Sequence, residues 1–212
     1  MSSIASQFAQ QLLEVQCIKL QPTQPFTWAS GWLSPFYCDN RKTLAYPKVR
    51  TFVKEQLAAM IRAQYPEATA IAGVATGAIA QGALVADALD LPMCYVRAKA
   101  KDHGMGNLIE GTLPEGAKVV VVEDLISTGG SSLKAVEALR AAGFEILGMV
   151  ASFTYGFPVA EEAFRAANVT LTTLTNYEAV VETARAIGYI EESHLPLLAR
   201  WRANPSTWSP EV

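Results

Sequence analysis

The sequence predicts an α/β fold with a mainly parallel five-stranded sheet, flanked by helices and preceded by a small N-terminal hood. Three observations support this prediction. Short apolar runs rich in β-branched residues recur along the chain, helical patterns lie between most of them, and half of the 212 residues are hydrophobic. Because parallel neighbours need crossover connections, strands that alternate with helices favour a sheet covered on both faces.

The first part of the chain combines a helix with irregular structure. An amphipathic helix is expected first, with these apolar residues on one face: Ile4, Phe8, Leu12 and Val15. A polar, proline-rich passage up to residue 46 then suggests short strands and turns, which form the expected hood. Pro47 begins a second helix that ends near Arg62, since proline is favoured in the first helical turn.

The alternation of strands and helices follows. The candidate strands are residues 69–74, 93–97, 118–123, 145–153 and 169–174. The helical patterns between them lie near residues 78–89, 128–142, 158–167 and 176–187, and a last helix follows Leu195. We therefore expect three parts: the helix and hood at 1–46, an α/β core at 47–190, and a C-terminal helix and tail at 191–212.

Composition excludes several classes of protein. The formal net charge is −3, so no basic field covers the molecule and a nucleic-acid partner is not expected. Residues 68–86 carry no charge but are mostly alanine and glycine, too weakly hydrophobic for a membrane span. The three cysteines are far apart, and the N-terminus has no basic segment typical of a signal peptide. A reducing, cytoplasmic location is expected.

The most informative motif begins with four consecutive valines, residues 119–122, which predict a fully buried strand. Glu123 and Asp124 follow, where only a ligand or solvent is expected to satisfy their carboxylates. Residues 127–131, here called the phosphate loop, are small and lead into a helix, so their backbone N–H groups and hydroxyls suit a phosphate. The alternative is an ordinary helix start capped by Ser127 or Thr128.

A second motif, here called the cationic loop, spans residues 97–107. Cations occur at every second position, at Arg97, Lys99 and Lys101, and His103 comes next. This spacing suits a loop that closes over an anion and could neutralise a departing pyrophosphate. The alternative is a solvated, charged loop.

A third motif, the glycine loop at residues 73–80, follows the first strand of the sheet, and its glycines permit a close approach of a ligand to the backbone. Tight packing between strand and helix explains it equally well. In open parallel sheets, ligands bind beyond the carboxyl ends of the strands, where all three loops are expected.

The run from Glu123 to Ser131 resembles the phosphoribosyl pyrophosphate (PRPP) motif of the type I phosphoribosyltransferases. The resemblance implies that the acidic pair holds ribose hydroxyls and that the phosphate loop holds the 5′-phosphate. The PRPP-binding residues that it implies, with the cationic loop included, are Arg97, Lys99, Lys101, His103, Glu123, Asp124, Leu125, Ile126, Ser127, Thr128, Gly129, Gly130 and Ser131.

The cationic loop resembles the catalytic loop of the orotate phosphoribosyltransferase family, whose pattern matches Arg97, Lys101 and His103. Residues 26–31 and 34–41 resemble the hood of the same family, and with residues 153–157 included the likeness covers about residues 1–190. It implies a pentosyltransferase that moves ribose 5-phosphate from PRPP to orotate in pyrimidine biosynthesis. It also implies a homodimer with shared active sites and Mg²⁺ held mainly through PRPP. The catalytic residues implied are Lys101, His103 and Asp124, and the orotate-binding residues are Ser127, Phe36 and Tyr37.

The chain also departs from the family pattern. Three cations that many members carry are missing: a lysine in the hood, where this chain has Ala29 and Leu33, a lysine in the glycine loop, where it has Gly77, and an arginine after the fourth strand, where it has Tyr155. Arg41 and Lys42 are therefore candidates for binding the orotate carboxylate, and backbone N–H groups are another. Two other functions remain open, a purine or uracil phosphoribosyltransferase and a PRPP-sensing regulator. A regulator would need a DNA-binding module, for which this chain has no room.

Overall fold

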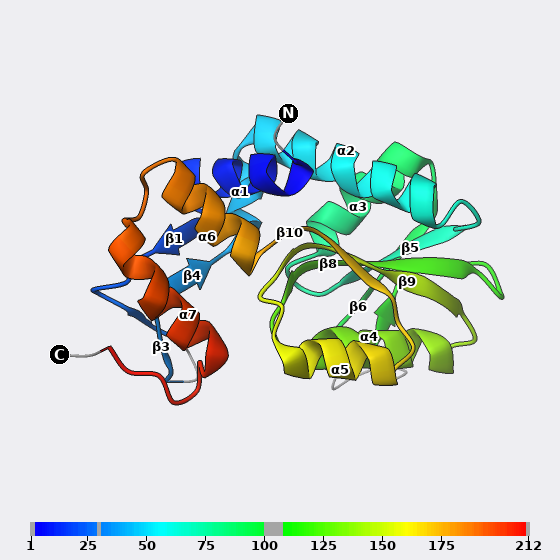
Figure 1. Ribbon diagram of the computed structural model, residues 1–212. Helices are drawn as coiled ribbons and strands as arrows, with labels where there is room; N and C mark the ends of the chain where they lie inside the picture. Colours follow the sequence, from blue (N-terminus) through cyan, green and yellow to red (C-terminus); the bar gives the residue numbers. More distant parts are fainter. Residues whose placement is uncertain (1–2, 29–30, 100–107, 211–212) are drawn as a thin grey trace. The chain divides into compact units, whose positions relative to one another are not determined.

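The computed structural model describes residues 3–28, 31–99 and 108–210 (Figure 1). The chain forms two compact units: residues 44–174, and residues 1–43 together with 175–212. The structure thus groups residues 175–190 with the N-terminal segment, whereas the sequence assigned them to the core. The reason is that the helix after the last strand packs on the first helix of the chain.

The α/β class and the mainly parallel sheet are confirmed, but the sheet has six strands and not five. Their order is β10-β9-β8-β5-β6-β7. The bounds are β5 Ala70–Val74, β6 Met93–Val96, β7 Ile109–Glu110, β8 Lys118–Ile126, β9 Glu145–Thr154 and β10 Leu171–Asn176. Strand β5 is parallel to β6 and β8, β8 is parallel to β9, and β7 pairs antiparallel with β6. The sequence missed β7 because two residues are too few to show a pattern.

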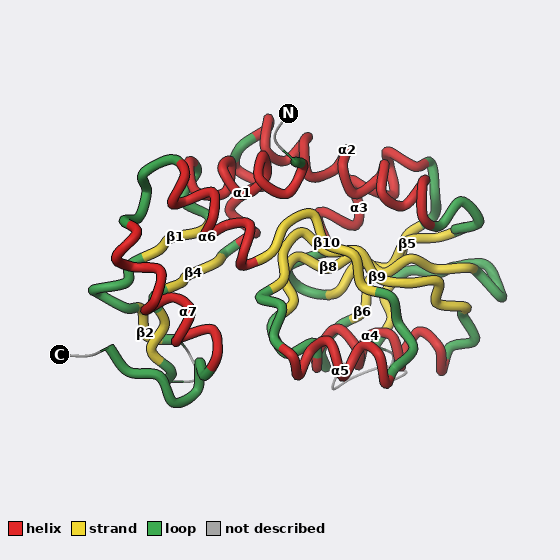
Figure 2. Tube along the Cα trace, in the orientation of Figure 1, coloured by secondary structure: helices red, strands yellow, loops and turns green. Residues whose placement is uncertain are grey.

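Helices cover both faces of this sheet. Figures 1 and 2 show α2 (Pro47–Gln64) and α3 (Ile79–Leu89) on one face, and α4 (Gly130–Ala141) and α5 (Pro158–Ala166) on the other. The valines of β8 explain this arrangement, because all four are fully buried. Val119 and Val121 belong to the cluster that includes Val136 of α4 and Phe164 of α5. Val120 and Val122 point to the opposite face of the sheet, because successive side chains of a strand alternate between its faces.

The other unit combines the hood with the end of the chain. It contains α1 (Ile4–Glu14), β1 (Ile18–Leu20), β2 (Phe26–Thr27), β3 (Leu33–Ser34), β4 (Phe36–Cys38), α6 (Tyr177–Ala186), η2 (Glu192–His194) and α7 (Leu195–Ala203), with the first turn of η1 (Asn40–Ala45). Helix α1 buries Phe8 and Leu12 as expected, but Ile4 is 48% exposed because it lies in the first turn. Among the described residues, no helix has both the length and the apolar character needed to cross a membrane.

Aromatic rings form the core of this unit. Phe36 is fully buried, with its ring 5.1 Å from that of Tyr177 and stacked at 6.3 Å on that of Trp201. The indole N–H of Trp201 donates a hydrogen bond to the carbonyl of Leu33, at 3.2 Å. These contacts join β3 and β4 to α6 and α7, and they explain why the first and last parts of the chain form one unit.

Candidate active site

Strand β8 continues through both acidic residues of the motif and ends at Ile126, beyond the expected end at residue 123. Glu123 is only 5% exposed. The Ser132 hydroxyl donates to Glu123 Oε2 at 2.8 Å, and the backbone N–H of Asp124 donates to Glu123 Oε1 at 3.0 Å. The expectation that only a ligand or solvent satisfies this carboxylate was therefore wrong, because α4 brings Ser132 against it.

Burial has a clear electrostatic effect on this acidic pair. The loss of solvation, followed by the negative charge of Asp124, raises the pKa of Glu123 from 4.5 to about 8. The shift favours the protonated form of Glu123. Asp124 is half-buried, and its carboxylate is the more accessible of the two. A protonated Glu123 repels a phosphorylated ligand less than an ionised one would.

The glycine loop lies directly against this pair. A Cβ atom added at Gly77 would overlap the carboxylate of Asp124. The absence of a side chain at Gly77 thus leaves the space that Asp124 occupies. The peptide bond between Ala75 and Thr76 in the same loop is cis. The structure therefore brings the glycine loop and the acidic pair together, as the parallel-sheet argument predicted.

The phosphate loop ends at an open helix start. Gly129 is the N-cap of α4, with φ of +80°, and no side chain caps the helix. This differs from the alternative in which Ser127 or Thr128 is an ordinary cap. Gly130 and Ser131 are exposed in the first turn, where helical N–H groups have no intrahelical partner. Such a helix start suits an anion.

Two other residues implied to bind PRPP differ in exposure. Leu125 is half-buried, whereas Ile126 is fully buried and belongs to the hydrophobic cluster under α4. The carbonyl of Ile126 accepts a hydrogen bond from the N–H of Tyr155, at 3.0 Å. Tyr155 is itself buried, with its ring stacked at 5.3 Å on that of Phe157. Ile126 therefore has only backbone atoms to offer a ligand.

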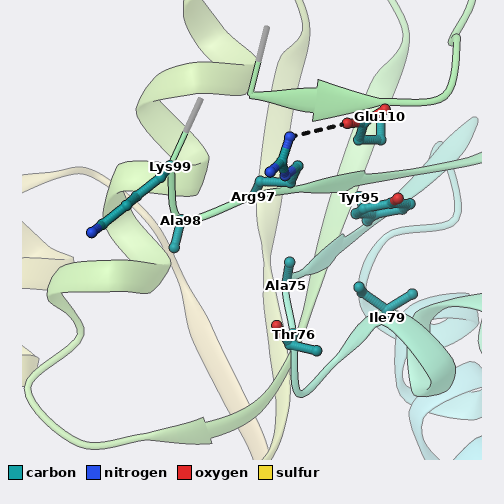
Figure 3. Close-up of a pocket in the computed structure, with 8 residues that line it drawn as sticks. All are labelled: Ala75, Thr76, Ile79, Tyr95, Arg97, Ala98, Lys99 and Glu110. Carbon is teal, nitrogen blue, oxygen red and sulfur yellow. Dashed lines mark hydrogen bonds and ion pairs between the residues drawn. The ribbon is translucent and has the colours of Figure 1, made fainter. Parts of the chain in front are cut away.

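The described end of the cationic loop borders a pocket of about 520 Å³ (Figure 3). Arg97 follows β6 directly, and its Nη1 lies 3.4 Å from Oε1 of Glu110 in β7. Figure 3 shows Arg97 turned towards Glu110 and Lys99 extended away from this pair. Lys101 and His103 lie outside the described residues. Glu110 was missed in the sequence, where no pattern links it to Arg97.

A second pocket connects the cationic loop with the phosphate loop. It has a volume of about 630 Å³ and shares Ala75, Arg97 and Ala98 with the first. It extends to Gly130 and Ser131 at the start of α4. Gly130 and Ser131 thus share a cavity with residues that follow β5 and β6, whereas Glu123, Asp124, Ser127 and Thr128 line neither of these two pockets.

The hood residues are placed within their own unit. Phe36 is enclosed by aromatic rings, while Tyr37 is half-buried with its ring 5.4 Å from that of Phe26. The ammonium of Lys42 lies 5.5 Å from the centre of the Tyr37 ring. Arg41 pairs with Asp39 at 2.8 Å. Within the described ranges, no group of three or more His, Cys, Asp or Glu side chains could hold a metal ion.

Comparison with known proteins gives a consistent result. Residues 49–186 match the phosphoribosyl transferase domain. The chain is 64% identical over 208 residues to the orotate phosphoribosyltransferase of Bacteroides thetaiotaomicron, covering 98% of each protein. It is 53% identical over 206 residues to that of Listeria innocua, covering 97% of this chain and 99% of the relative.

Solved structures agree with these sequence matches. The crystal structure of orotate phosphoribosyltransferase from Aeropyrum pernix superposes with a TM-score of 0.74 at 27% identity, covering 87% of this chain and 99% of that one. The UMP synthase of Leishmania donovani shares the fold, with a TM-score of 0.79 at 23% identity over 94% of this chain and 42% of that one. The chain therefore belongs to the orotate phosphoribosyltransferase family, whose members carry the phosphoribosyl transferase domain.

Proposed function

We propose that this chain transfers ribose 5-phosphate from PRPP to N1 of orotate, giving orotidine 5′-phosphate and pyrophosphate for UMP synthesis. One observation carries the proposal. An acidic pair, an uncapped helix start and an arginine-lined pocket all lie at the carboxyl ends of β5, β6 and β8. These three features match the three parts of PRPP, which are the ribose hydroxyls, the 5′-phosphate and the pyrophosphate.

The phosphate loop and the acidic pair hold the ribose phosphate in this proposal. Backbone N–H groups of Gly130 and Ser131 donate to the 5′-phosphate, together with the hydroxyls of the loop. Asp124 accepts hydrogen bonds from the ribose hydroxyls because its carboxylate is the more accessible one. Glu123 lies on the buried side of the pair, and its raised pKa favours the neutral form, which adds no second negative charge next to the substrate.

The cations of the cationic loop act on the leaving group. No side-chain nucleophile is required, because breakage of the bond to pyrophosphate leads and leaves an oxocarbenium-like ribose. The protein therefore aligns the two reactants and stabilises the developing charge on pyrophosphate. We assign this role to Arg97, Lys99, Lys101 and His103, with His103 as a proton donor.

Magnesium is part of the proposal. PRPP supplies most of its oxygen ligands, and Asp124 is the carboxylate that we assign to its surroundings. When bound, this hard cation lowers the negative charge of the pyrophosphate oxygens.

For orotate, we propose contact with Tyr37 and with Ser127. Phe36 packs inside its own unit, so its contribution is to fix β4, the strand that carries Tyr37. Arg41 contacts Asp39 through Nε, and the ammonium of Lys42 lies over the Tyr37 ring. Both stay candidates to meet the orotate carboxylate, as do backbone N–H groups.

The direct test of this function mixes the pure protein with PRPP, Mg²⁺ and orotate and follows the loss of orotate absorbance. We expect turnover with orotate and none with uracil or a purine base. Turnover of a purine but not of orotate would assign the chain to another base. The Lys101→Ala variant is expected to lose most of its kcat, and full kcat in this variant would remove the cationic loop from catalysis.

We further propose a homodimer with shared active sites, in the cytoplasm. Cys17, Cys38 and Cys94 form no disulfide bond, which fits a reducing compartment. Shared sites can be tested by mixing two inactive variants, Lys101→Ala and Asp124→Asn. If the cationic loop serves the partner's site, subunit exchange creates one site with both defects and one intact site, and activity returns. Sites formed within one subunit would remain inactive in the mixture.

A further inference from the structure

Strands β6 and β7 place Arg97 and Glu110 on the same face of the sheet edge. Tyr95 pairs with Glu110, and the N–H of Arg97 donates to the carbonyl of Leu108 at 2.8 Å. Residues two apart on a strand share a face, so Arg97 is the diagonal neighbour of Glu110 across the strand pair. Long side chains at diagonal positions can meet, and the Nη1–Oε1 distance of 3.4 Å shows that these two do.

This ion pair is neither a free surface pair nor a buried one. The side chains of Arg97 and Glu110 are 33% and 25% exposed, and both line the 520 Å³ pocket. Ala75 and Thr76 of the glycine loop line the same pocket, and Figure 3 shows them on the side away from Glu110. A ligand in this pocket would therefore meet the guanidinium of Arg97 between the glycine loop and β7.

The geometry of arginine allows it to serve two acidic groups at once. The guanidinium has five N–H donors in a fixed plane, and the contact with Glu110 uses Nη1. The remaining donors point in other directions within that plane. An arginine side chain that is already held by a carboxylate also loses less rotamer freedom when it binds an anion than an arginine side chain without a partner.

We propose that Glu110 is a positioning residue for Arg97, which it orients for binding the diphosphate group of the substrate and of the product. This inference rests on the proposed function, which identifies the anion as a diphosphate. Glu110 does not touch the reacting atoms in this account, because its effect passes through Arg97.

A simpler view of Glu110 makes the opposite prediction. If Glu110 were only a negative charge near an anion site, its removal would strengthen anion binding through Coulomb attraction. If Glu110 positions Arg97, its removal weakens anion binding although the site becomes more positive. The sign of the change therefore distinguishes the two accounts.

The test measures pyrophosphate binding by calorimetry, with Mg²⁺ present, to the full chain and to Glu110→Gln. We expect the affinity to fall roughly five- to tenfold, the size of other couplings between contacting charged residues. The KM for PRPP should rise by a similar factor, with a smaller change in kcat. The Glu110→Asp variant keeps the carboxylate and should recover part of the loss if it still reaches Arg97.

Two controls make the result specific. Glu145→Gln removes the same charge from a pair with Lys118, 3.9 Å apart at the amino end of the strands, and should leave both constants within about twofold. In an Arg97→Ala background, Glu110→Gln should have no further effect. Three results would overturn the proposal. They are unchanged or tighter pyrophosphate binding by Glu110→Gln, an equal loss of affinity in the Arg97→Ala background, and no pyrophosphate binding by the unaltered protein. If pyrophosphate binds as expected but orotate is not turned over, only the proposed function fails.

Discussion

Replacing Gly129 with alanine tests how the core fixes the start of α4. Gly129 has φ of +80°, and a Cβ atom there would lie 2.8 Å from Cε2 of Phe164. Phe164 is buried in the cluster between the sheet and α5, so its ring cannot turn into solvent. The substitution therefore combines an unfavourable backbone conformation with overpacking at the N-cap of the proposed phosphate site.

The expected loss of stability follows from these two effects. The left-handed conformation costs a residue with a Cβ about 1–2 kcal/mol, and overpacking costs about 1–3 kcal/mol more. The lower entropy of the unfolded chain returns about 0.4–1 kcal/mol. We expect a net decrease of about 2–4 kcal/mol in the free energy of unfolding. For a chain of this size the decrease corresponds to a Tm roughly 5–15 °C lower.

Gly116 provides the matched control. It also has a positive φ, of +68°, but no atom lies within 4 Å of an added Cβ. Gly116→Ala should lose only the backbone contribution, about 1 kcal/mol. Urea denaturation of both variants gives the comparison, and thermal unfolding with and without PRPP reports on the site. The increase in Tm caused by PRPP should shrink in Gly129→Ala and persist in Gly116→Ala.

Two results would refute this reasoning. One is an equal loss of stability in Gly129→Ala and Gly116→Ala, which would mean that the Phe164 contact relaxes at no cost. The other is strict additivity in the double variant Gly129→Ala/Phe164→Leu. If the ring causes the strain, the smaller side chain relieves it, and the double variant loses less than the two single variants together.

Three further predictions concern titration, packing and reactivity. Folding raises the pKa of Glu123 from 4.5 to about 8. Between pH 4.5 and pH 8 the native state therefore binds more protons than the unfolded chain, so the free energy of unfolding falls as the pH rises through this range. Urea denaturation from pH 5 to 9 should show a smaller fall for Glu123→Gln, and an equal fall would contradict the shift. Gly77→Ala should push the Asp124 carboxylate aside and raise the KM for PRPP several-fold, which initial-rate measurements can show. Its loss of stability should be small, because only the flexible Asp124 side chain has to move. A thiol reagent should label Cys38 first in the native protein, since Cys17 and Cys94 are buried and their thiol pKa values are raised to about 11. Rapid labelling of all three cysteines would contradict this prediction.

Much of the fold could be predicted because its signals are local. Four consecutive valines define the centre of β8, and Pro47 marks the start of α2. The missed features depend on tertiary contacts. Strand β7 has two residues and exists only because it pairs with β6, and α6 belongs with α1 through packing that no periodicity encodes.

In the candidate site, too, the sequence predicts positions in the fold but not tertiary contacts. The positions of three loops at one sheet edge followed from the rule for parallel sheets. The partners of their side chains did not, because they come from distant parts of the chain. Ser132 reaches back to Glu123 from α4, and Glu110 reaches Arg97 across a strand pair. The roles of Lys101 and His103, which lie outside the described residues, stay predictions.

The raised pKa of Glu123 is itself an argument for function. A buried carboxyl that keeps its proton costs stability at neutral pH, whereas a neutral amide has no such cost and its oxygen could still accept from the Asp124 N–H or the Ser132 hydroxyl. Local choices that conflict with stability are expected at functional sites. Unlike an amide, the acid can lose its proton, and a phosphorylated ligand beside Asp124 opposes that loss. With PRPP binding measured in the absence of Mg²⁺, the affinity of the unaltered protein should therefore fall more between pH 6 and pH 9 than the affinity of Glu123→Gln, and an equal pH dependence of the two would contradict this role.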